Sequence, residues 1–491
     1  MSMWLAGLVV LGTSAAVMVL EILAGRLLAP YLGVTLETWT GIIGTILAGI
    51  ALGTWLGGRL ADRVDPRRTL GPLLVVGGAL TLAVVPLVGI AGGLRLRSDP
   101  VGIVTFALLC CLLPAAVLSA VNPTVVKIQL RDLARTGSVV GRLSAIGTTG
   151  AIAGTFLTGF VLVAAVPSRP IVIALGATLI VAGVLLGAVL ARATRVPLAL
   201  LGATALVLGT GWTVATAQPC ERESAYFCIR VDDDATQAST VRTLRLDTLR
   251  HATVDLADPT WLGFAYTRAF GDVIDAMAPA GEAIDALHIG GGGFTMPRYI
   301  AATRPGSTSL VLELDPQVLA TARDELGLVT GDDLVVRTGD ARTAIADAPS
   351  DAFDLVVGDA FGGLAVPWHL TTRELVAEVA RTLRPGGLYI LNVIDYPPLA
   401  FARAELATLA DVFQHVAVLG PPTLATGRSG GNVILLASDQ PLPVGAVLAA
   451  DDTRGGTNVL VSDADEVAEW VGDAEVLTDD FAPVDQLLGH R

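Results

Sequence analysis

The sequence is poor in the residues that usually bind metals and phosphates. It contains five histidines and four cysteines in 491 residues, and Lys127 is its only lysine. No Cys-x-x-Cys pair and no Cys/His spacing of the zinc-binding kind occurs, so the sequence predicts no metal site. No lysine follows a glycine-rich loop, which excludes a P-loop for nucleoside triphosphates. Charged residues make up only 16% of the chain and hydrophobic residues 53%, which is typical of a protein with membrane-spanning segments.

The two halves of the chain differ in charge. Residues 1–217 hold 14 of the 32 basic and 6 of the 46 acidic residues, a net charge of +8, whereas the remainder has a net charge of −22. An acidic surface repels phosphates, so we expect no binding of nucleic acid by the second half. Its field would attract cations, polyamines included, although an Asp-rich surface also serves solubility alone.

Seven apolar segments in the first half are long enough to cross a bilayer, which takes about 20 residues per helix. They cover residues 4–28, 38–57, 69–91, 101–121, 143–166, 170–191 and 196–217. We therefore expect residues 1–217 to form a multi-pass α-helical membrane bundle in a lipid bilayer. Glycines recur every four residues at Gly49, Gly53 and Gly57, a spacing that lets helix backbones pack closely.

Two polar features interrupt these segments. Glu21 lies deep in the first segment, where a charge is costly, so it is expected to face a partner helix or water. A structural pair and a role in transport are both open for this carboxylate, while Arg26, nearer the segment's end, can extend to the interface. Asn122-Pro123 is expected to end or kink the fourth segment.

Basic residues predict the orientation of the bundle. The connections on one side hold ten Lys and Arg and those on the other side hold three. Because the richer side is cytoplasmic, we predict a cell-membrane protein whose C-terminal half, after seven crossings, lies outside the cytoplasm. Cys220 and Cys228 follow the last segment, and the sequence leaves open whether they form a disulfide or remain free thiols.

The second half alternates strand and helix patterns. Residues 228–256 alternate in polarity as a β-hairpin or small sheet does. Continuous apolar strands then alternate with helices, which predicts an α/β doubly wound parallel sheet of the Rossmann type. We expect a linker and hairpin over 218–260, the α/β domain over 261–440 and a C-terminal tail packed on it over 441–491.

Glycines or carboxylates follow four successive strands of this predicted sheet. "ALHIGGGG" ends in Gly290–Gly293, "LVLELD" places Glu313 about 20 residues later, and Asp340 and Asp359 follow the next two strands. Ligands of such sheets bind beyond the carboxyl ends of the strands. Glycines allow close backbone approach, and an acid at this spacing suits ribose hydroxyls. The pattern favours a nucleoside with a small, cationic appendage, and S-adenosyl compounds fit that description.

Several motifs carry a resemblance to a known family. "IGGGGFTMPRY", "LELD", "GDAR" and "FDLVVGDAFGG" resemble those of the spermidine synthases, the polyamine aminopropyltransferases. "EILAGRLLAPYLG", "ALGTWLGGRLADR", "PWHLTTRE" and "LTDDFAPVDQL" are similar to the branch of that family in which a membrane bundle precedes the synthase domain. The resemblance implies an S-adenosylmethionine-methyltransferase-like fold that binds decarboxylated S-adenosylmethionine, or S-adenosylmethionine itself, as a co-substrate.

The resemblance also implies roles for particular residues. Asp359 matches the catalytic aspartate that orients the attacking amine and accepts its proton. Tyr266 matches a family tyrosine, and His251 stands where the family often has glutamine. His369 could act as a base or simply adjoin a helix cap. The residues that match donor-binding positions are Gly290, Gly291, Gly292, Glu313 and Asp340.

Two departures from the family pattern concern the amine. Gly293 stands where the family has an aspartate in the glycine loop, and Gly362 stands at its second gate aspartate. Both losses are carboxylates that would hold a cationic amine, at a cost of about 2 kcal/mol each. Phe294 and Trp368 either make the pocket more apolar or pack the loops.

Three functions follow as hypotheses. The first is a membrane-anchored transferase that moves an aminopropyl group from an S-adenosyl donor to an amine acceptor. The second is methyl transfer from S-adenosylmethionine on the same fold. The third is a non-catalytic transport or sensing protein whose synthase-like domain binds a ligand. A nucleoside donor, an amine acceptor and the bilayer are the expected partners, and a homodimer is compatible with the sequence.

Overall fold

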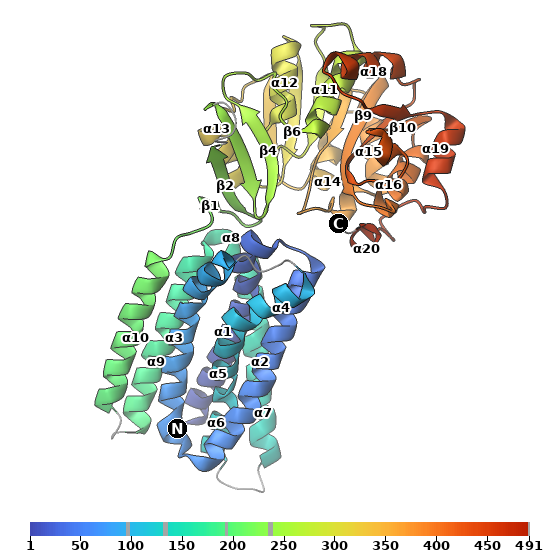
Figure 1. Cartoon of the computed structure of the whole chain (residues 1–491). Helices are drawn as coiled ribbons and strands as arrows, with labels where there is room; N and C mark the ends of the chain where they lie inside the picture. Colours follow the sequence, from blue (N-terminus) through green and yellow to red (C-terminus); the bar gives the residue numbers. More distant parts are fainter. Residues whose placement is uncertain (95–98, 131–135, 192–194, 234–238, 490–491) are drawn as a thin grey trace. The chain divides into compact units, whose positions relative to one another are not determined.

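The computed structural model describes residues 1–94, 99–130, 136–191, 195–233 and 239–489. The chain divides into two compact units, Met1–Cys228 and Ile229–Arg491. The division falls within the segment 218–260 that the sequence marks as a linker. Each unit is described by itself below (Figure 1).

The first unit is helical. Seven of its helical stretches are long and apolar enough to cross a membrane: Met3–Leu32, Leu36–Arg63, Pro66–Gly93, Pro100–Gln129, Thr136–Ala165, Ser168–Leu190 and Val196–Ala215. They overlap the seven segments expected from the sequence. The elements are α1(Met3–Leu32), α2(Leu36–Arg63), α3(Pro66–Gly93), α4(Pro100–Ala107), η1(Leu108–Leu112), α5(Leu113–Ser119), α6(Val121–Gln129), α7(Thr136–Phe156), η3(Leu157–Leu162), α8(Val163–Ala165), α9(Ser168–Leu190), α10(Arg195–Ala215) and the short strand β1(Arg222–Glu223).

Glycines bring helices of this unit into backbone contact. A Cβ at Gly53 of α2 would collide with the backbone of Ala116 in α5, and one at Gly57 would lie 2.6 Å from the Ala120 Cα. Gly150 and Gly154 of α7 meet the backbone of α1 in the same way. The small-residue spacing therefore serves close helix packing.

The fourth membrane-length segment is broken rather than ended at Asn122-Pro123. Helix α5 ends at Ser119 and α6 starts at Val121, so the segment continues to Gln129. Pro123 lacks the N–H that would bond the carbonyl four residues earlier, which accounts for a break at this point. Of the sequence's two alternatives, an end or a kink, the structure excludes an end at this point, because α6 continues to Gln129.

Arg26 makes an ion pair that the sequence did not predict. Its guanidinium lies 3.1 Å from the Glu223 carboxylate and also donates to the carbonyls of Ser224 and Ala225. Glu223 accepts a further hydrogen bond from the Ser168 amide. Cys220 and Cys228 form a disulfide that closes the loop carrying these groups, which decides between the alternatives the sequence left open.

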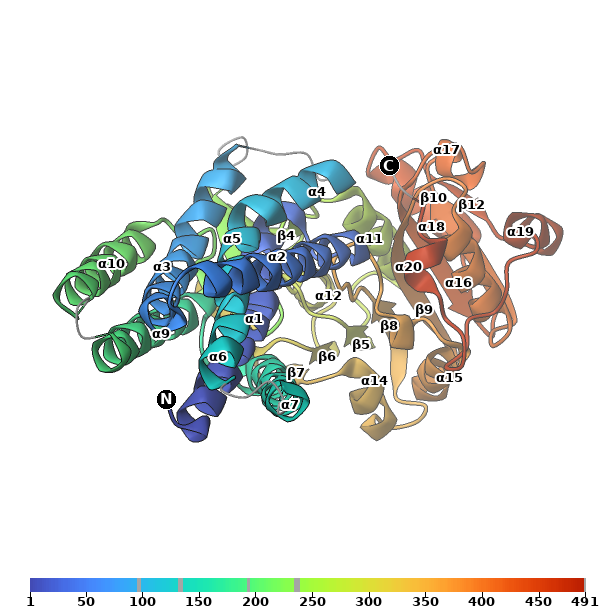
Figure 2. The same cartoon turned by 90° about the horizontal axis from the view of Figure 1, so that it is seen from below.

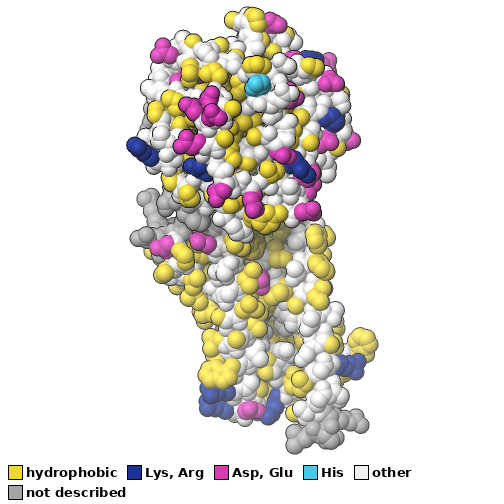
Figure 3. Space-filling model, turned by 90° about the vertical axis from the view of Figure 1, so that its right-hand side faces the viewer, with side chains coloured by type: hydrophobic (Ala, Val, Ile, Leu, Met, Phe, Trp, Pro, Cys, Tyr) yellow, Lys and Arg dark blue, Asp and Glu magenta, His cyan; other side chains and the backbone are white. Residues whose placement is uncertain are grey.

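Basic residues gather at one end of the helical unit, while hydrophobic side chains cover its sides (Figure 3). Lys127 Nζ donates to Asp62 Oδ1 at 2.6 Å, and Gln129 Nε2 donates to the Met1 carbonyl at 3.2 Å. These contacts bring the start of α1, the end of α2 and the end of α6 together at that end. Five of the arginines counted for orientation lie outside the described residues: Arg95, Arg97, Arg131, Arg135 and Arg192.

A small antiparallel sheet in the order β1-β2-β3-β4 precedes the large sheet; its last two strands lie wholly in the second unit. Its strands β2(Cys228–Asp233), β3(Val241–Leu246) and β4(Leu249–Asp255) pair in sequence. The sequence predicts a β-hairpin or small sheet over residues 228–256, and the structure has the small sheet. Buried Leu244, Ala252 and Val254 give it one apolar face.

The large sheet has eight strands in the order β12-β10-β11-β9-β8-β5-β6-β7. Figure 2 shows its strands β7, β6, β5, β8 and β9 side by side in that order. Strands β9, β8, β5, β6 and β7 are mutually parallel, whereas β11 pairs antiparallel with β9, β10 with β11 and β12 with β10. The sheet is therefore mixed and Rossmann-like, and the prediction of a wholly parallel sheet is wrong for its last three strands. Its strands are β5(Asp285–Ile289), β6(Thr308–Glu313), β7(Leu334–Thr338), β8(Phe353–Gly358), β9(Leu383–Asp395), β10(His415–Gly420), β11(Gly431–Ser438) and β12(Val459–Val461).

Helices pack on both faces of the large sheet. Leu287 and Ile289 of β5 belong to a core shared with α15 and α16, whereas Ala286 belongs to a core shared with α11 and α12. This alternation places the carboxyl ends of the parallel strands between two helical layers. The helical elements are α11(Ala265–Met277), α12(Thr295–Thr303), α13(Pro316–Glu325), α14(Ala341–Ala344), η5(Ile345–Asp347), η6(Trp368–Leu370), α15(Arg373–Thr382), α16(Ala400–Ala410), α17(Pro422–Ala425), α18(Val444–Thr453), α19(Ala464–Val471) and α20(Val484–Leu487).

Helix α15 is capped by Thr372, whose hydroxyl accepts from the Leu375 amide. The helix ends at Thr382, and the Pro-Gly-Gly stretch that follows belongs to β9.

Candidate active site

The glycine loop after β5 lies tightly between neighbouring elements. Gly290 has φ of +96°, and a Cβ there would lie 2.5 Å from the Asp359 carbonyl oxygen. Gly292 has φ of +50°. Both positions therefore require glycine for conformation, and Gly290 requires it for space as well.

Glu313, at the end of β6, holds this loop in place. Its Oε2 accepts hydrogen bonds from the amides of Gly291 at 2.9 Å and Gly292 at 3.2 Å, and its Oε1 accepts one from the Asp315 amide at 2.8 Å. The side chain is 7% exposed, and burial raises the pKa of its carboxyl while the three amides oppose that rise. A carboxylate has about four lone-pair sites, so one remains for a ligand hydroxyl.

Asp359, directly after β8, lies in a chain of hydrogen bonds. Tyr266 donates its hydroxyl to Asp359 Oδ2 at 3.1 Å, and the Asn392 amide donates to Oδ1 at 2.9 Å. Asn432 in turn donates to Asn392 Oδ1 at 3.0 Å. Burial raises the pKa of Asp359 to about 6, although the two hydrogen bonds lower it. Burial and the neighbouring carboxylate raise the pKa of Tyr266, which keeps its hydroxyl protonated as the donor.

These residues line one cavity of about 370 Å³. The glycine loop forms one wall, Tyr266 and His251 come from α11 and β4, and Asp359 stands at the end of β8. Among the described residues that line the cavity, Asp359 is the one carboxylate and Arg250 the one guanidinium. The cavity therefore offers a single anionic group to a cationic ligand.

The two histidines in this cavity are uncharged at neutral pH. Burial lowers the pKa of His251 to about 4 and that of His288 to about 3. His288 lies within β5, and its Nε2 is 3.3 Å from the Ser309 hydroxyl. Neutral imidazoles add hydrogen-bonding groups to the cavity without adding charge.

Asp340 and His369 lie outside the lining of this cavity. His369 Nε2 is 3.4 Å from Asp340 Oδ1, and the same oxygen caps α14 by accepting from the Arg342 amide at 2.9 Å. The structure therefore brings together Tyr266, His251, the glycines and Asp359, with Glu313 behind the loop. It joins Asp340 to His369 at the start of α14, not to Asp359.

The two aromatic residues expected to shape the pocket have other surroundings. Phe294 is fully buried, has φ of +54° and packs under the loop near Gly291. Trp368 is 51% exposed and contacts the His369 ring edge-on at 5.7 Å. Neither lines the cavity, so the packing interpretation applies to Phe294.

Sequence reasoning missed Asn392, Asn432 and Arg250. Asn392 is 1% exposed and lies in the middle of the apolar strand β9. A polar residue inside "LYILNVID" was a usable signal, because a buried amide requires hydrogen-bond partners. Asn432 and Arg250 carry no comparable signal, since both stand near strand ends where polar residues are common.

In sequence, the chain is similar to a polyamine aminopropyltransferase of Vibrio vulnificus, with 29% identity over 213 residues, or 41% of this chain and 69% of the relative. A polyamine aminopropyltransferase of Chromobacterium violaceum is 28% identical over 164 residues, or 32% of this chain and 60% of the relative. An eEF1A lysine and N-terminal methyltransferase of Danio rerio is 28% identical over 130 residues, or 25% of this chain and 19% of the relative. Each match covers less than half of this chain.

Among solved structures, the chain is similar to a probable spermidine synthase from Corynebacterium glutamicum, with 27% identity and a TM-score of 0.48 over 53% of this chain and 95% of that protein. A spermidine synthase in complex with the transition-state analogue AdoDATO has 16% identity and a TM-score of 0.36, over 51% of this chain and 78% of that protein. No protein-family model matches the chain.

Proposed function

We propose that the C-terminal unit, which is spermidine-synthase-like, is a transferase that moves an aminopropyl group from an S-adenosyl donor to an amine. The observation that carries this proposal is the placement of Asp359. It stands at a strand end beside the glycine loop, is held by Tyr266 and Asn392, and has a pKa raised to about 6. Such a carboxylate is a better proton acceptor at neutral pH than an ordinary aspartate.

In the proposed reaction, the acceptor nitrogen attacks the propyl carbon bonded to the donor sulfonium. The new C–N bond forms while the C–S bond breaks, and its electron pair stays on sulfur as a neutral thioether. The proton lost from the amine passes to Asp359 Oδ. Tyr266 and Asn392 act as positioning residues, because they hold both carboxylate oxygens and fix their direction.

The donor would lie along the carboxyl ends of the strands. Gly290, Gly291 and Gly292 permit close approach of its nucleoside, and Glu313 has a lone pair left for a ribose hydroxyl. Asp340 would contribute only to a part of the donor that extends beyond the cavity, because it is paired with His369.

The acceptor would carry one cationic amine in the site. A diamine binds best where each ammonium meets a carboxylate, and Asp359 is the one carboxylate lining this cavity. Arg250 also lines the cavity and carries the opposite charge. It therefore favours an acceptor that also carries an anionic or strongly polar group. This distinguishes the proposed acceptor from putrescine.

Methyl transfer from S-adenosylmethionine is the second candidate. Glycine at positions 293 and 362 leaves the site without the carboxylates that would hold an aminopropyl group and a diamine, and this favours a donor with a different appendage. If neither donor binds, the third hypothesis, a non-catalytic transport or sensing role, is the one that stands.

Calorimetry of the full-length chain in detergent tests these functions. The probes are decarboxylated S-adenosylmethionine, S-adenosylmethionine and methylthioadenosine. Binding of the decarboxylated compound about tenfold tighter than S-adenosylmethionine supports aminopropyl transfer, and the reverse order supports methyl transfer. Absence of binding of all three at millimolar concentration contradicts both enzymatic functions.

Asp359→Asn then separates chemistry from binding. We expect a loss of turnover of about 10²-fold or more with donor affinity within about threefold, because the carboxylate acts on the amine proton. Equal losses of turnover and donor affinity would contradict the catalytic role.

We further propose that the helical unit spans the cell membrane. The seven apolar stretches support this by length and composition, and exposed leucine, valine and phenylalanine side chains along them would face lipid. The basic bias and the Cys220–Cys228 disulfide support an extracytoplasmic C-terminal unit.

A further inference from the structure

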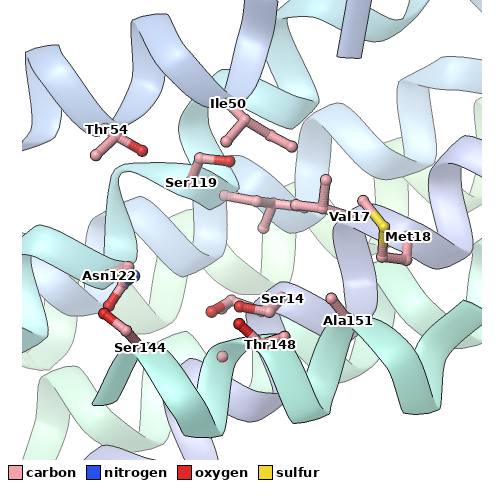
Figure 4. Close-up of a pocket in the computed structure, with 13 residues that line it drawn as sticks. Ser14, Val17, Met18, Ile50, Thr54, Ser119, Asn122, Ser144, Thr148 and Ala151 are labelled. Atoms are coloured by element: carbon pink, nitrogen blue, oxygen red, sulfur yellow. The ribbon is translucent and has the colours of Figure 1, made fainter. Parts of the chain in front are cut away.

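The helical unit contains a polar cavity of about 300 Å³. It lies between α1, α2, α5, α6 and α7, and Figure 4 shows the side chains that line it. Hydroxyls or amides come from all five helices. The polar lining residues are Thr13, Ser14, Thr54, Ser119, Asn122, Ser144 and Thr148.

The break between α5 and α6 lies in the wall of this cavity. Ser119 is the last residue of α5, and Asn122 belongs to the first turn of α6. Because Pro123 has no N–H, it cannot donate to the carbonyl of Ser119 as an ordinary residue four positions later would. Broken helices that expose backbone and side-chain groups to a cavity are a recurrent way to build ligand sites within membrane bundles.

One buried polar atom in this wall has no hydrogen-bond partner among the residues that the structure describes. Asn122 Oδ1 is buried and receives no hydrogen bond from any described residue. Figure 4 shows the Asn122 side chain beside Ser144, and Ser14 beside Thr148 on the facing helix. A buried acceptor without a donor costs about 1–3 kcal/mol, so a ligand or water that donates to it is favoured.

The cavity carries no formal charge among its thirteen lining residues. Glu21 lies one helical turn beyond Val17 on α1, but it is not part of the lining. A cation or anion would therefore lose its hydration without gaining a counter-charge. An apolar ligand would leave Asn122 and the hydroxyls unsatisfied, although Val17, Ile50 and Leu118 provide some apolar wall.

We propose that this cavity binds a small uncharged molecule that carries hydroxyl or amide groups and is no larger than a nucleoside. A volume of about 300 Å³ corresponds to roughly ten water molecules, which sets this upper size. The site is independent of the proposed transferase function, because every residue that lines it belongs to the helical unit.

A thiol placed in the cavity tests the proposal. Ser144→Cys in the full-length chain is reacted with N-ethylmaleimide in detergent micelles, and the labelling rate is measured alone and with adenosine, ribose, glycerol or putrescine. The native thiols Cys110 and Cys111 are buried, and Cys220 and Cys228 are paired, so they contribute little labelling.

We expect Ser144→Cys to react and at least one of the three uncharged probes to slow the reaction about tenfold or more at saturation, whereas putrescine does not. Adding Asn122→Leu should remove this protection, because the amide that contacts the ligand is lost. Thr149→Cys is the matched control: it lies on α7, is exposed and does not line the cavity. A thiol facing detergent ionises poorly, so it should react slowly and show no protection.

Four outcomes would overturn the proposal. Labelling without protection by adenosine, ribose or glycerol means that the cavity holds water only. Protection by putrescine equal to that by the uncharged probes means that the site does not select against charge. Unchanged protection in the Asn122→Leu background means that the probe binds at another place. A folded Ser144→Cys chain that fails to label means that the cavity is closed to the reagent.

Discussion

Gly293 packs against Ala252 of β4 so closely that a side chain at position 293 would place its Cβ 2.3 Å from the Ala252 Cβ, far below van der Waals contact. The aspartate that the family resemblance implies at this point cannot be accommodated unless β4 moves. Gly362 is different, because a Cβ there would meet nothing closer than Pro367 Cγ at 3.8 Å. Packing thus accounts for the first missing carboxylate, and nothing in the structure explains the second.

This contrast predicts that Gly362→Asp is accommodated without disturbing the fold and adds a carboxylate next to Phe361 and Gly363, which line the cavity. We expect putrescine to bind the full-length variant about tenfold more tightly than the native chain, because a charge-assisted hydrogen bond is worth about 1.5–3 kcal/mol. Calorimetry measures the change. Gly362→Asn, which has the same shape and no charge, is the control, and an equal gain in both variants would show that charge is not the cause.

The pH dependence of turnover should report the ionisation of Asp359. Its pKa is raised to about 6 by burial, so the carboxylate accepts a proton above that pH and is already protonated below it. Turnover should therefore rise as pH increases through about 6. Tyr266→Phe removes a hydrogen bond that stabilises the ionised form, and its acidic limb should move to higher pH. If the acidic limb of the pH profile does not move in Tyr266→Phe, a group other than Asp359 titrates.

Glu405 should lower the free energy of unfolding at neutral pH. It is fully buried in α16, and neither carboxylate oxygen has a hydrogen-bond partner among the described residues. Burial raises the pKa of Glu405 well above its usual value. A carboxyl whose folded-state pKa is raised stabilises fully below its unfolded pKa, and this contribution is lost as pH rises towards the folded value.

Glu405→Gln removes this pH-dependent loss of stability. The variant should gain about 1–3 kcal/mol over the native chain at pH 8 and much less at pH 5, as followed by thermal unfolding of the full-length protein at both pH values. Glu378→Gln is the control, because Glu378 is a surface residue paired with Arg381 at 2.8 Å and such pairs contribute little. A gain independent of pH would contradict the explanation.

The glycines of α2 allow a paired test of helix packing. Gly53→Ala would push its Cβ into the Ala116 backbone of α5, whereas Gly44→Ala on the same helix would enter open space. We expect Gly53→Ala to destabilise the helical unit by about 1–3 kcal/mol and Gly44→Ala to leave it unchanged or slightly more stable. The thermal stability of the purified chain in one detergent distinguishes them, and similar behaviour of the two variants would show that this contact is not tight in solution.

The proposed orientation can be tested with reporter fusions. Alkaline phosphatase fused after Arg491 should be active and a fluorescent protein there should be dark, because only the former folds outside the cytoplasm in that context. The same reporters fused after Asp65, in the connection between α2 and α3, should behave in the opposite way. Fluorescence at the C-terminus with inactive phosphatase would place that unit in the cytoplasm.

The sequence was sufficient for the elements whose signal is local. Seven apolar runs and the alternation of strands from Asp285 to Asp395 carry their periodicity within short windows. The antiparallel direction of β10, β11 and β12 was not predictable in this way, because an apolar strand has the same composition in either direction. Strand direction depends on how the chain returns to the sheet, which no local pattern records.

The residues of the candidate site likewise differ in how far they could be predicted from the sequence. Asp359 and the glycine loop follow predicted strands, so their proximity could be inferred from the rule that parallel strands end at one edge. The Asn392 amide reaches Asp359 across neighbouring strands, and the pairing of Asp340 with His369 depends on the path of a loop. Such contacts come from tertiary packing, and single residues in the sequence do not reveal them.

The loop closed by Cys220 and Cys228 lies where the polypeptide leaves the helical unit, and Arg26 holds its Glu223. A protease that cuts between these two cysteines would break the backbone, but the disulfide would still join the two fragments. The two fragments would run as one species on a gel without reductant and separate only after the cystine is reduced. The protein can therefore be nicked near the junction of its two units and still keep them covalently joined.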